Sequence, residues 1–181
     1  PQEKIKQLFG HCFEITKLEE GDQIPVGGES IFSGEANVKV TGDFERFNDF
    51  FEQVTEIASK YDLPKLKEWL VSQGIYINEQ VFAKLLAFTK KFEQQYSHNP
   101  EREQNRKKLY MEQGTKLSDV FRENSAECAE ITALAQRYLQ LAGVPSTYFS
   151  GDVLWDKDWE FSEEHSFIVV RQDDRVYLYD P

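Results

Sequence analysis

The last third of the sequence predicts one helix followed by paired strands, and this order constrains the fold more than any other feature. From residue 128 to the glycine at 143, apolar residues recur at helical spacing, in the order Ile131, Ala135, Tyr138 and Ala142. A proline two residues after that glycine is typical of a helix end. Residues 164–171 and 175–180 then have the composition of two strands. The pattern predicts an α+β fold in which this helix packs on an antiparallel sheet.

Cys128 is predicted to lie in the first turn of this helix. Asn124 and Ser125 are good N-cap residues, and Glu127 follows Asn124 at the spacing of a capping-box variant. The positive dipole end and unpaired N–H groups of a first turn favour a thiolate and also suit an oxyanion. Taken alone, a buried free cysteine on a helix face is the commoner interpretation, so the catalytic one depends on the residues that follow.

The pairing of the two predicted strands decides whether the His165 and Asp180 side chains can contact each other. A turn at residues 173–174 would pair Gln172 with Arg175. That register leaves His165 and Asp180 on one face as a diagonal pair within side-chain reach. A slip of one residue would place them on opposite faces, so the prediction depends on the register. Asp180 would then fix the tautomer of the His165 imidazole and stabilise its charged form.

These segments together resemble a known family. A cysteine that opens a helix, AxxxxLAQRYLQLAGVP, a strand ending in SG, EHSFIVV and a strand ending in YDP are similar to the transglutaminase-like group within the papain-like cysteine enzymes. The resemblance covers roughly the last 65 residues. It implies a helix packed on an antiparallel sheet, with Cys128 as nucleophile, His165 as general base and acid, and Asp180 as the residue that orients His165.

The chain departs from the family pattern at two places. Members commonly have Gly just before the cysteine and an aromatic after the histidine pair, whereas this chain has Glu127 and Ser166-Phe167. These departures leave the substrate class open. The backbone N–H of Cys128 is the main candidate for oxyanion binding, and Asn124 is a weak one because its expected task is the N-cap.

Trp155 and Trp159 lie in the loop before His165. They are interpreted either as core residues or as walls of a substrate groove, and the sequence favours neither.

Residues 1–113 are predicted to form a mixed, mainly helical N-terminal region, and residues 114–181 the transglutaminase-like catalytic core, unless 1–181 is one continuous domain. HCFEI and ANVKVTG are short strand candidates. Helices are expected over 44–61, 64–74, 78–97 and 100–114. Cys12 is predicted to be a small buried apolar residue, since adjacent His11 would point to the opposite face of a strand.

Composition excludes several classes of function. The formal net charge of −11 argues against nucleic-acid binding, which needs clustered Lys and Arg. No stretch approaches the ~20 apolar residues of a membrane span. Two cysteines far apart, without CxxC or HxxxH spacing, predict neither a disulfide framework nor a zinc site, and no cofactor is expected. A reducing compartment, cytoplasmic or host-cytosolic, is compatible with this usage, and the oligomeric state is not predicted.

Three functions remain open at this stage. The first is a cysteine-dependent enzyme that acts on protein amide bonds through a thioester, by deamidation, transamidation or peptide hydrolysis. The second is a small-molecule amide hydrolase or acyltransferase with the same triad, and the third is an interaction module with a vestigial triad. The helical N-terminal half and acidic composition also resemble bacterial effectors and toxins of this superfamily.

Overall fold

The fold is built on a five-stranded antiparallel sheet. The structure is a computed structural model that describes residues 4–9, 12–26, 38–96, 99–112, 114–154 and 162–181. The strand order is β1-β2-β5-β6-β7, with bounds Ile5–Phe9, Cys12–Ile15, Ser146–Leu154, Ser162–Gln172 and Arg175–Tyr179. A second sheet pairs β3 (Gln23–Pro25) with β4 (Lys39–Thr41). The predicted α+β class, with a helix on an antiparallel sheet, is confirmed.

The predicted helical N-terminal part is wrong in one respect, because the chain begins in the main sheet. β2 pairs with β5 through Phe13↔Ser150 and Ile15↔Tyr148, and β1 continues the sheet beyond β2. The order is therefore sheet, helices, sheet. The HCFEI and ANVKVTG segments contain β2 and β4, so both strand candidates are confirmed. The domain boundary at residues 113 and 114 stays a prediction, although strands from both sides of it share one sheet.

Helices fill the middle of the chain. Their bounds are η1 Phe44–Phe47 (a 3-10 turn), α2 Asn48–Ser59, α3 Leu63–Ser72, α4 Glu79–Gln95, α5 Arg102–Tyr110 and α6 Leu117–Arg122. The four predicted helices are confirmed, with a 3-10 first turn at the start of the first. Asp62 and Asn78 cap α3 and α4 through their side chains, which explains where those helices begin. The short helix α6 was not predicted.

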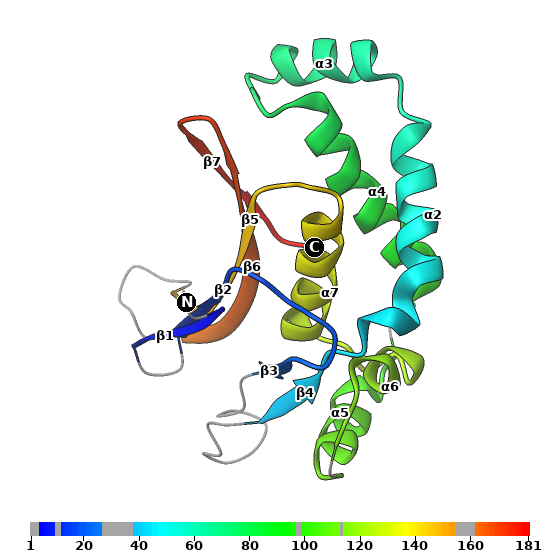
Figure 1. Cartoon of the computed structure of the whole chain (residues 1–181), viewed down its shortest axis with the longest axis vertical. Coiled ribbons are helices and arrows are strands. Elements are labelled where there is room, and N and C mark those ends of the chain that lie inside the picture. Colours follow the sequence, from blue (N-terminus) through cyan, green and yellow to red (C-terminus); the bar gives the residue numbers. More distant parts are fainter. Residues whose placement is uncertain (1–3, 10–11, 27–37, 97–98, 113, 155–161) are drawn as a thin grey trace.

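Helix α7 (Cys128–Leu141) lies between the sheet and the other helices, as Figure 1 shows. Its buried face packs on β5 and β6. On its other side, Tyr138 contacts Phe51 of α2 and Phe88 of α4. Because apolar partners cover it on both sides, α7 is the central element of the core.

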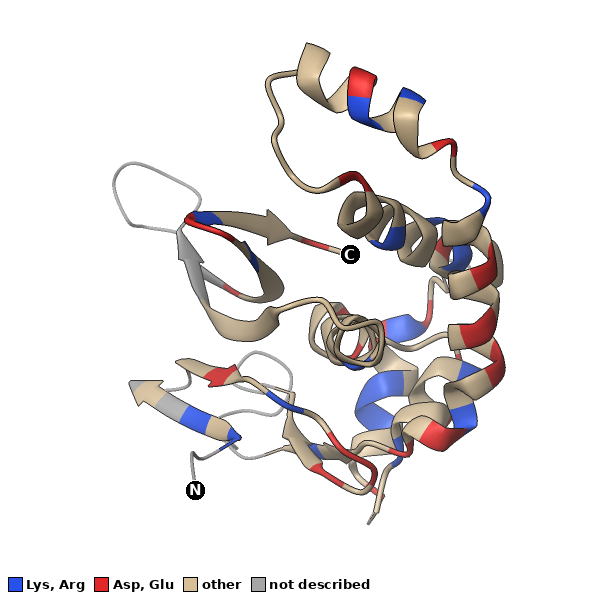
Figure 2. Cartoon of the chain, turned by 45° about the horizontal axis from the view of Figure 1, so that its top comes forward, with Lys and Arg blue, Asp and Glu red and all other residues tan. Residues whose placement is uncertain are grey.

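Charged residues lie mainly on the outer elements. Figure 2 shows acidic and basic residues interspersed along the helices.

No helix of the described part is long and apolar enough to cross a membrane.

Candidate functional site

The β6–β7 hairpin has the predicted register. Gln172 pairs with Arg175, and Ile168 pairs with Tyr179 further along the ladder. Asp173 adopts a left-handed φ of 53°, a conformation that tight hairpin turns require and that Asp tolerates well. The prediction of an even register is confirmed.

His165 and Asp180 meet as that register requires. His165 Nε2 lies 2.8 Å from Asp180 Oδ2. A carboxylate only accepts, so Nε2 carries the proton in the neutral ring and Nδ1 keeps its lone pair. Phe167 supports the ring from the same strand, with centroids 6.5 Å apart. The Asp180 carboxylate therefore fixes the tautomer of the His165 ring.

Cys128 lies in the first turn of α7, as predicted, and is its first residue, but the cap differs from the prediction. Glu127 is the N-cap, and Glu130 completes a reciprocal capping box. Asn124 instead occupies a turn position with a left-handed φ of 49°. The N-cap prediction for Asn124 is wrong because Glu130, three residues after Glu127, offers the carboxylate that the box needs.

The Cys128 thiol lies against the strand that carries the histidine. A hydrogen bond with the backbone of Ser166, the residue after His165, favours the thiolate, but burial outweighs it and raises the pKa of Cys128. Glu130 and Glu127 raise this pKa further. Thr132 on the next turn donates to Ser166 O at 3.1 Å and fixes the helix against the strand. The expected resting thiolate is thus disfavoured, because desolvation and the two carboxylates outweigh the Ser166 hydrogen bond and the charge of Arg106, which lower the pKa of Cys128.

No hydrogen bond joins Cys128 to His165 in the described part of the chain. The structure brings His165 and Asp180 into contact and places Cys128 beside the next residue of the same strand. Their catalytic roles stay predictions.

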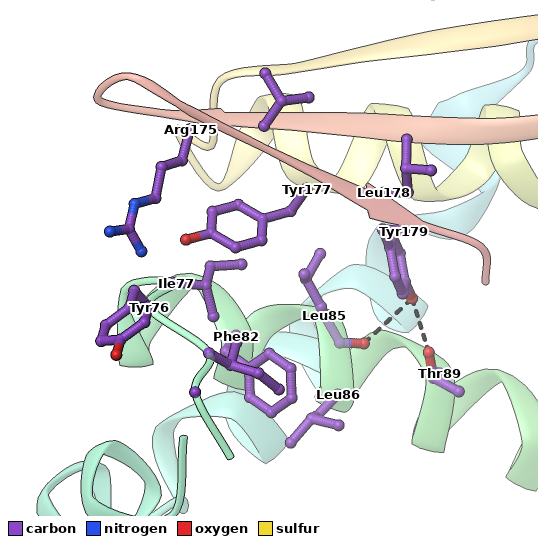
Figure 3. A pocket seen from close by; sticks show the side chains of 13 residues that line it. Tyr76, Ile77, Phe82, Leu85, Leu86, Thr89, Arg175, Tyr177, Leu178 and Tyr179 are labelled. Carbon is purple, nitrogen blue, oxygen red and sulfur yellow. Dashed lines mark hydrogen bonds between the residues drawn. The ribbon is translucent and has the colours of Figure 1, made fainter. Parts of the chain in front are cut away.

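Asp180 follows a tyrosine that anchors the end of β7. Tyr179 Oη lies 2.8 Å from Thr89 Oγ1 and donates to Leu85 O at 3.2 Å, as Figure 3 shows. Burial raises the pKa of Tyr179, so its hydroxyl stays protonated. Helix α4 therefore fixes the backbone from which Asp180 extends.

Replacing Tyr179 with phenylalanine is expected to lower the free energy of unfolding by about 1 kcal/mol, because the ring stays and its hydrogen bonds are lost. Denaturant unfolding measures this change. Thr89→Val provides a matched control, since it removes the same contact from α4. An unfolding free energy unchanged in both variants would show that these bonds do not hold the end of β7.

The anchored tyrosine also lines an apolar cavity of about 630 Å³ between α4 and β7. Figure 3 shows side chains of both elements facing each other across it. Arg175 lies over the Tyr76 ring at 4.5 Å at one end. The cavity is bounded by the strand that leads to Asp180.

The weaker sequence candidates have different outcomes. Asn124 lines a small cavity of about 180 Å³ with Ile131 and Arg102, and its oxyanion role stays a prediction. Trp155 and Trp159 lie outside the described residues, as does His11. Cys12 is buried, with 8% of its surface exposed, as predicted. Among the described residues, no group of three or more His, Cys, Asp or Glu side chains is placed to hold a metal ion.

Three polar residues near the start of α7 were not predicted from the sequence. Buried Arg106 and Glu130 and half-buried Tyr110 form a polar cluster under the first turn of α7. The spacing of Glu127 and Glu130 was an available signal for part of it. Arg106 lies in a strongly polar helix, where periodicity gives no sign of a buried charge.

A scan against protein-family models, a search of curated proteins and a search of solved structures found no match to this chain.

Proposed function

We propose that the chain is a transglutaminase-like, cysteine-dependent enzyme that transfers acyl groups from protein amide bonds through a thioester. The observation that carries the proposal is the 2.8 Å contact between His165 and Asp180. Ser166, which follows His165 on β6, forms a backbone hydrogen bond with the Cys128 thiol. A helix packed on an antiparallel sheet, with cysteine at the helix start and histidine on the strand, supports the likeness to this family.

The chemistry begins from a neutral thiol, since burial raises the pKa of Cys128. As Sγ attacks the carbonyl carbon, Nδ1 of His165 accepts the thiol proton, and Asp180 stabilises the resulting imidazolium. N–H groups at the start of α7 offer hydrogen bonds to the oxyanion. His165 then gives its proton to the leaving amine or ammonia, and a thioester remains on Cys128. Water completes hydrolysis or deamidation, and an amine completes transamidation.

A reactive ester tests thioester formation without knowledge of the natural substrate. Incubation with p-nitrophenyl acetate is expected to release nitrophenolate in a burst and to add about 42 Da to the peptide that contains Cys128. Cys128→Ala should abolish both signals, whereas Cys12→Ala should leave them unchanged. An equal burst in the Cys128→Ala variant would overturn the proposal.

The type of acyl transfer is read from intact masses of candidate protein substrates. A gain of about 1 Da per site reports deamidation, a loss of about 17 Da per crosslink reports transamidation, and fragments report proteolysis. Each product should disappear with Cys128→Ala. Products that persist in this variant would exclude Cys128 as the nucleophile.

A further inference from the structure

A buried ion pair lies under the first turn of α7. Arg106 Nε of α5 donates to Glu130 Oε1 at 2.7 Å, and Tyr110 Oη donates to the same oxygen at 2.6 Å. The exposed fractions of Arg106 and Glu130 are 2% and 0%. A buried ion pair is weak evidence for stability, because desolvation of both charges offsets their attraction. Its position invites a functional explanation.

The pair is connected directly to the residue before the cysteine. Glu130 Oε2 accepts from the backbone N–H of Glu127 at 3.1 Å, and Arg106 Nη1 lies 3.6 Å from Glu127 Oε2. Arg106 also donates to Val26 O at 3.3 Å, which ties the turn to the segment after β3. The first turn of α7 is thus fixed through α5 to a part of the chain about 100 residues away in sequence.

We propose that Arg106 and Glu130 are positioning residues for Cys128: their ion pair holds the first turn of α7 in place and sets one charge of each sign near the start of this helix. The inference rests on the proposed function, because it assigns the pair a task only if Cys128 is the nucleophile. It goes beyond the triad by adding a charged pair from α5 and α7.

The charges that face the thiol come from several elements. Glu127 and Glu130 belong to the N-cap and first turn of its own helix, Arg106 to α5 and Tyr148 to β5. The two glutamates disfavour the thiolate, whereas Arg106 favours it. Loss of Glu130 and loss of Arg106 should therefore change the reactivity of Cys128 in opposite directions. Damage to the packing alone would change it in the same direction for both.

The test compares the pH profiles of Cys128 alkylation by iodoacetamide in Glu130→Gln and Arg106→Met, read by mass at the Cys128 peptide. Glu130→Gln should move the midpoint to lower pH and speed alkylation at pH 8 by roughly tenfold, the effect of one unit in the thiol pKa. Arg106→Met should move the midpoint to higher pH and slow alkylation at pH 8. Arg106→Lys keeps the charge and should restore most of the parent profile if Arg106→Met does not fold.

Arg137→Met is the matched control, because Arg137 lies on the same helix and donates to Leu18 O at 2.7 Å. It should lower the melting temperature and leave the pH midpoint unchanged. A Glu130→Gln profile that superimposes on the parent, or a shift in the same direction for both variants of the pair, would overturn the inference.

The p-nitrophenyl acetate burst distinguishes a failure of the positioning inference from a failure of the proposed function. A burst that needs Cys128 and His165, with an unchanged pH midpoint in Glu130→Gln, overturns the positioning inference alone. A burst that persists in Cys128→Ala overturns the function, whatever the pH profiles show.

Discussion

Replacing His165 with alanine is expected to slow acylation of Cys128 by p-nitrophenyl acetate by about 10²–10⁴-fold, the usual effect of losing a general base. The effect should be large because the resting thiol is neutral, so attack requires a base. Single-turnover nitrophenolate release, followed between pH 6 and 9, gives the rate constant. The loss should be greatest near neutral pH and should narrow as hydroxide begins to ionise the thiol.

Two further variants distinguish the effect of the Asp180 charge on His165 from the effect of the neighbouring Phe167 ring. Asp180→Asn removes the charge but keeps the shape, so a large loss of rate would follow from the wrong tautomer and a weaker base. Phe167→Leu keeps the His165–Asp180 bond and removes the ring at 6.5 Å, and its rate should fall by less than about tenfold. An acylation rate in His165→Ala equal to that of the parent would contradict a role for this histidine.

The hairpin shows what the sequence could predict. A two-residue turn fixes the strand register, and the side-chain period of two then decides which residues share a face. The meeting of His165 and Asp180 follows from those local rules. The place of Cys128 in the first turn of α7 was also predicted from local signals, although the N-cap is Glu127 and not Asn124.

The missed features depend on contacts between distant segments. β2 pairs with β5 across more than 130 residues, and alternation within a short strand does not indicate its neighbour. The raised pKa of Cys128 also depends on distant segments, because they bury its thiol. The sequence indicates the place of Cys128 on the helix but not this burial. Arg106 pairs with Glu130 across 24 residues, from a helix whose composition suggested only a solvated surface.

An aromatic cluster links the site to the helices. Phe88 of α4 is fully buried and contacts Phe50 of α2, Phe92 of its own helix and Tyr138 of α7, at ring centroid distances of 5.6, 6.5 and 5.9 Å. The next residue, Thr89, holds the end of β7 through Tyr179. One turn of α4 therefore packs in the core and also anchors the end of β7, the strand that leads to Asp180.

Replacing Phe88 with alanine is expected to lower the free energy of unfolding by about 3–5 kcal/mol, because it removes a fully buried ring and leaves a cavity that three helices border. Phe88→Leu should cost less, since it retains most of the apolar volume. Denaturant unfolding measures both changes. Leu86→Ala on the same helix is a half-buried control and should cost less than Phe88→Ala. Folded Phe88→Ala should also acylate Cys128 more slowly than the parent if α4 positions Asp180, whereas an unchanged rate would mean that the pairing of β7 with β6 is enough to place Asp180 beside His165.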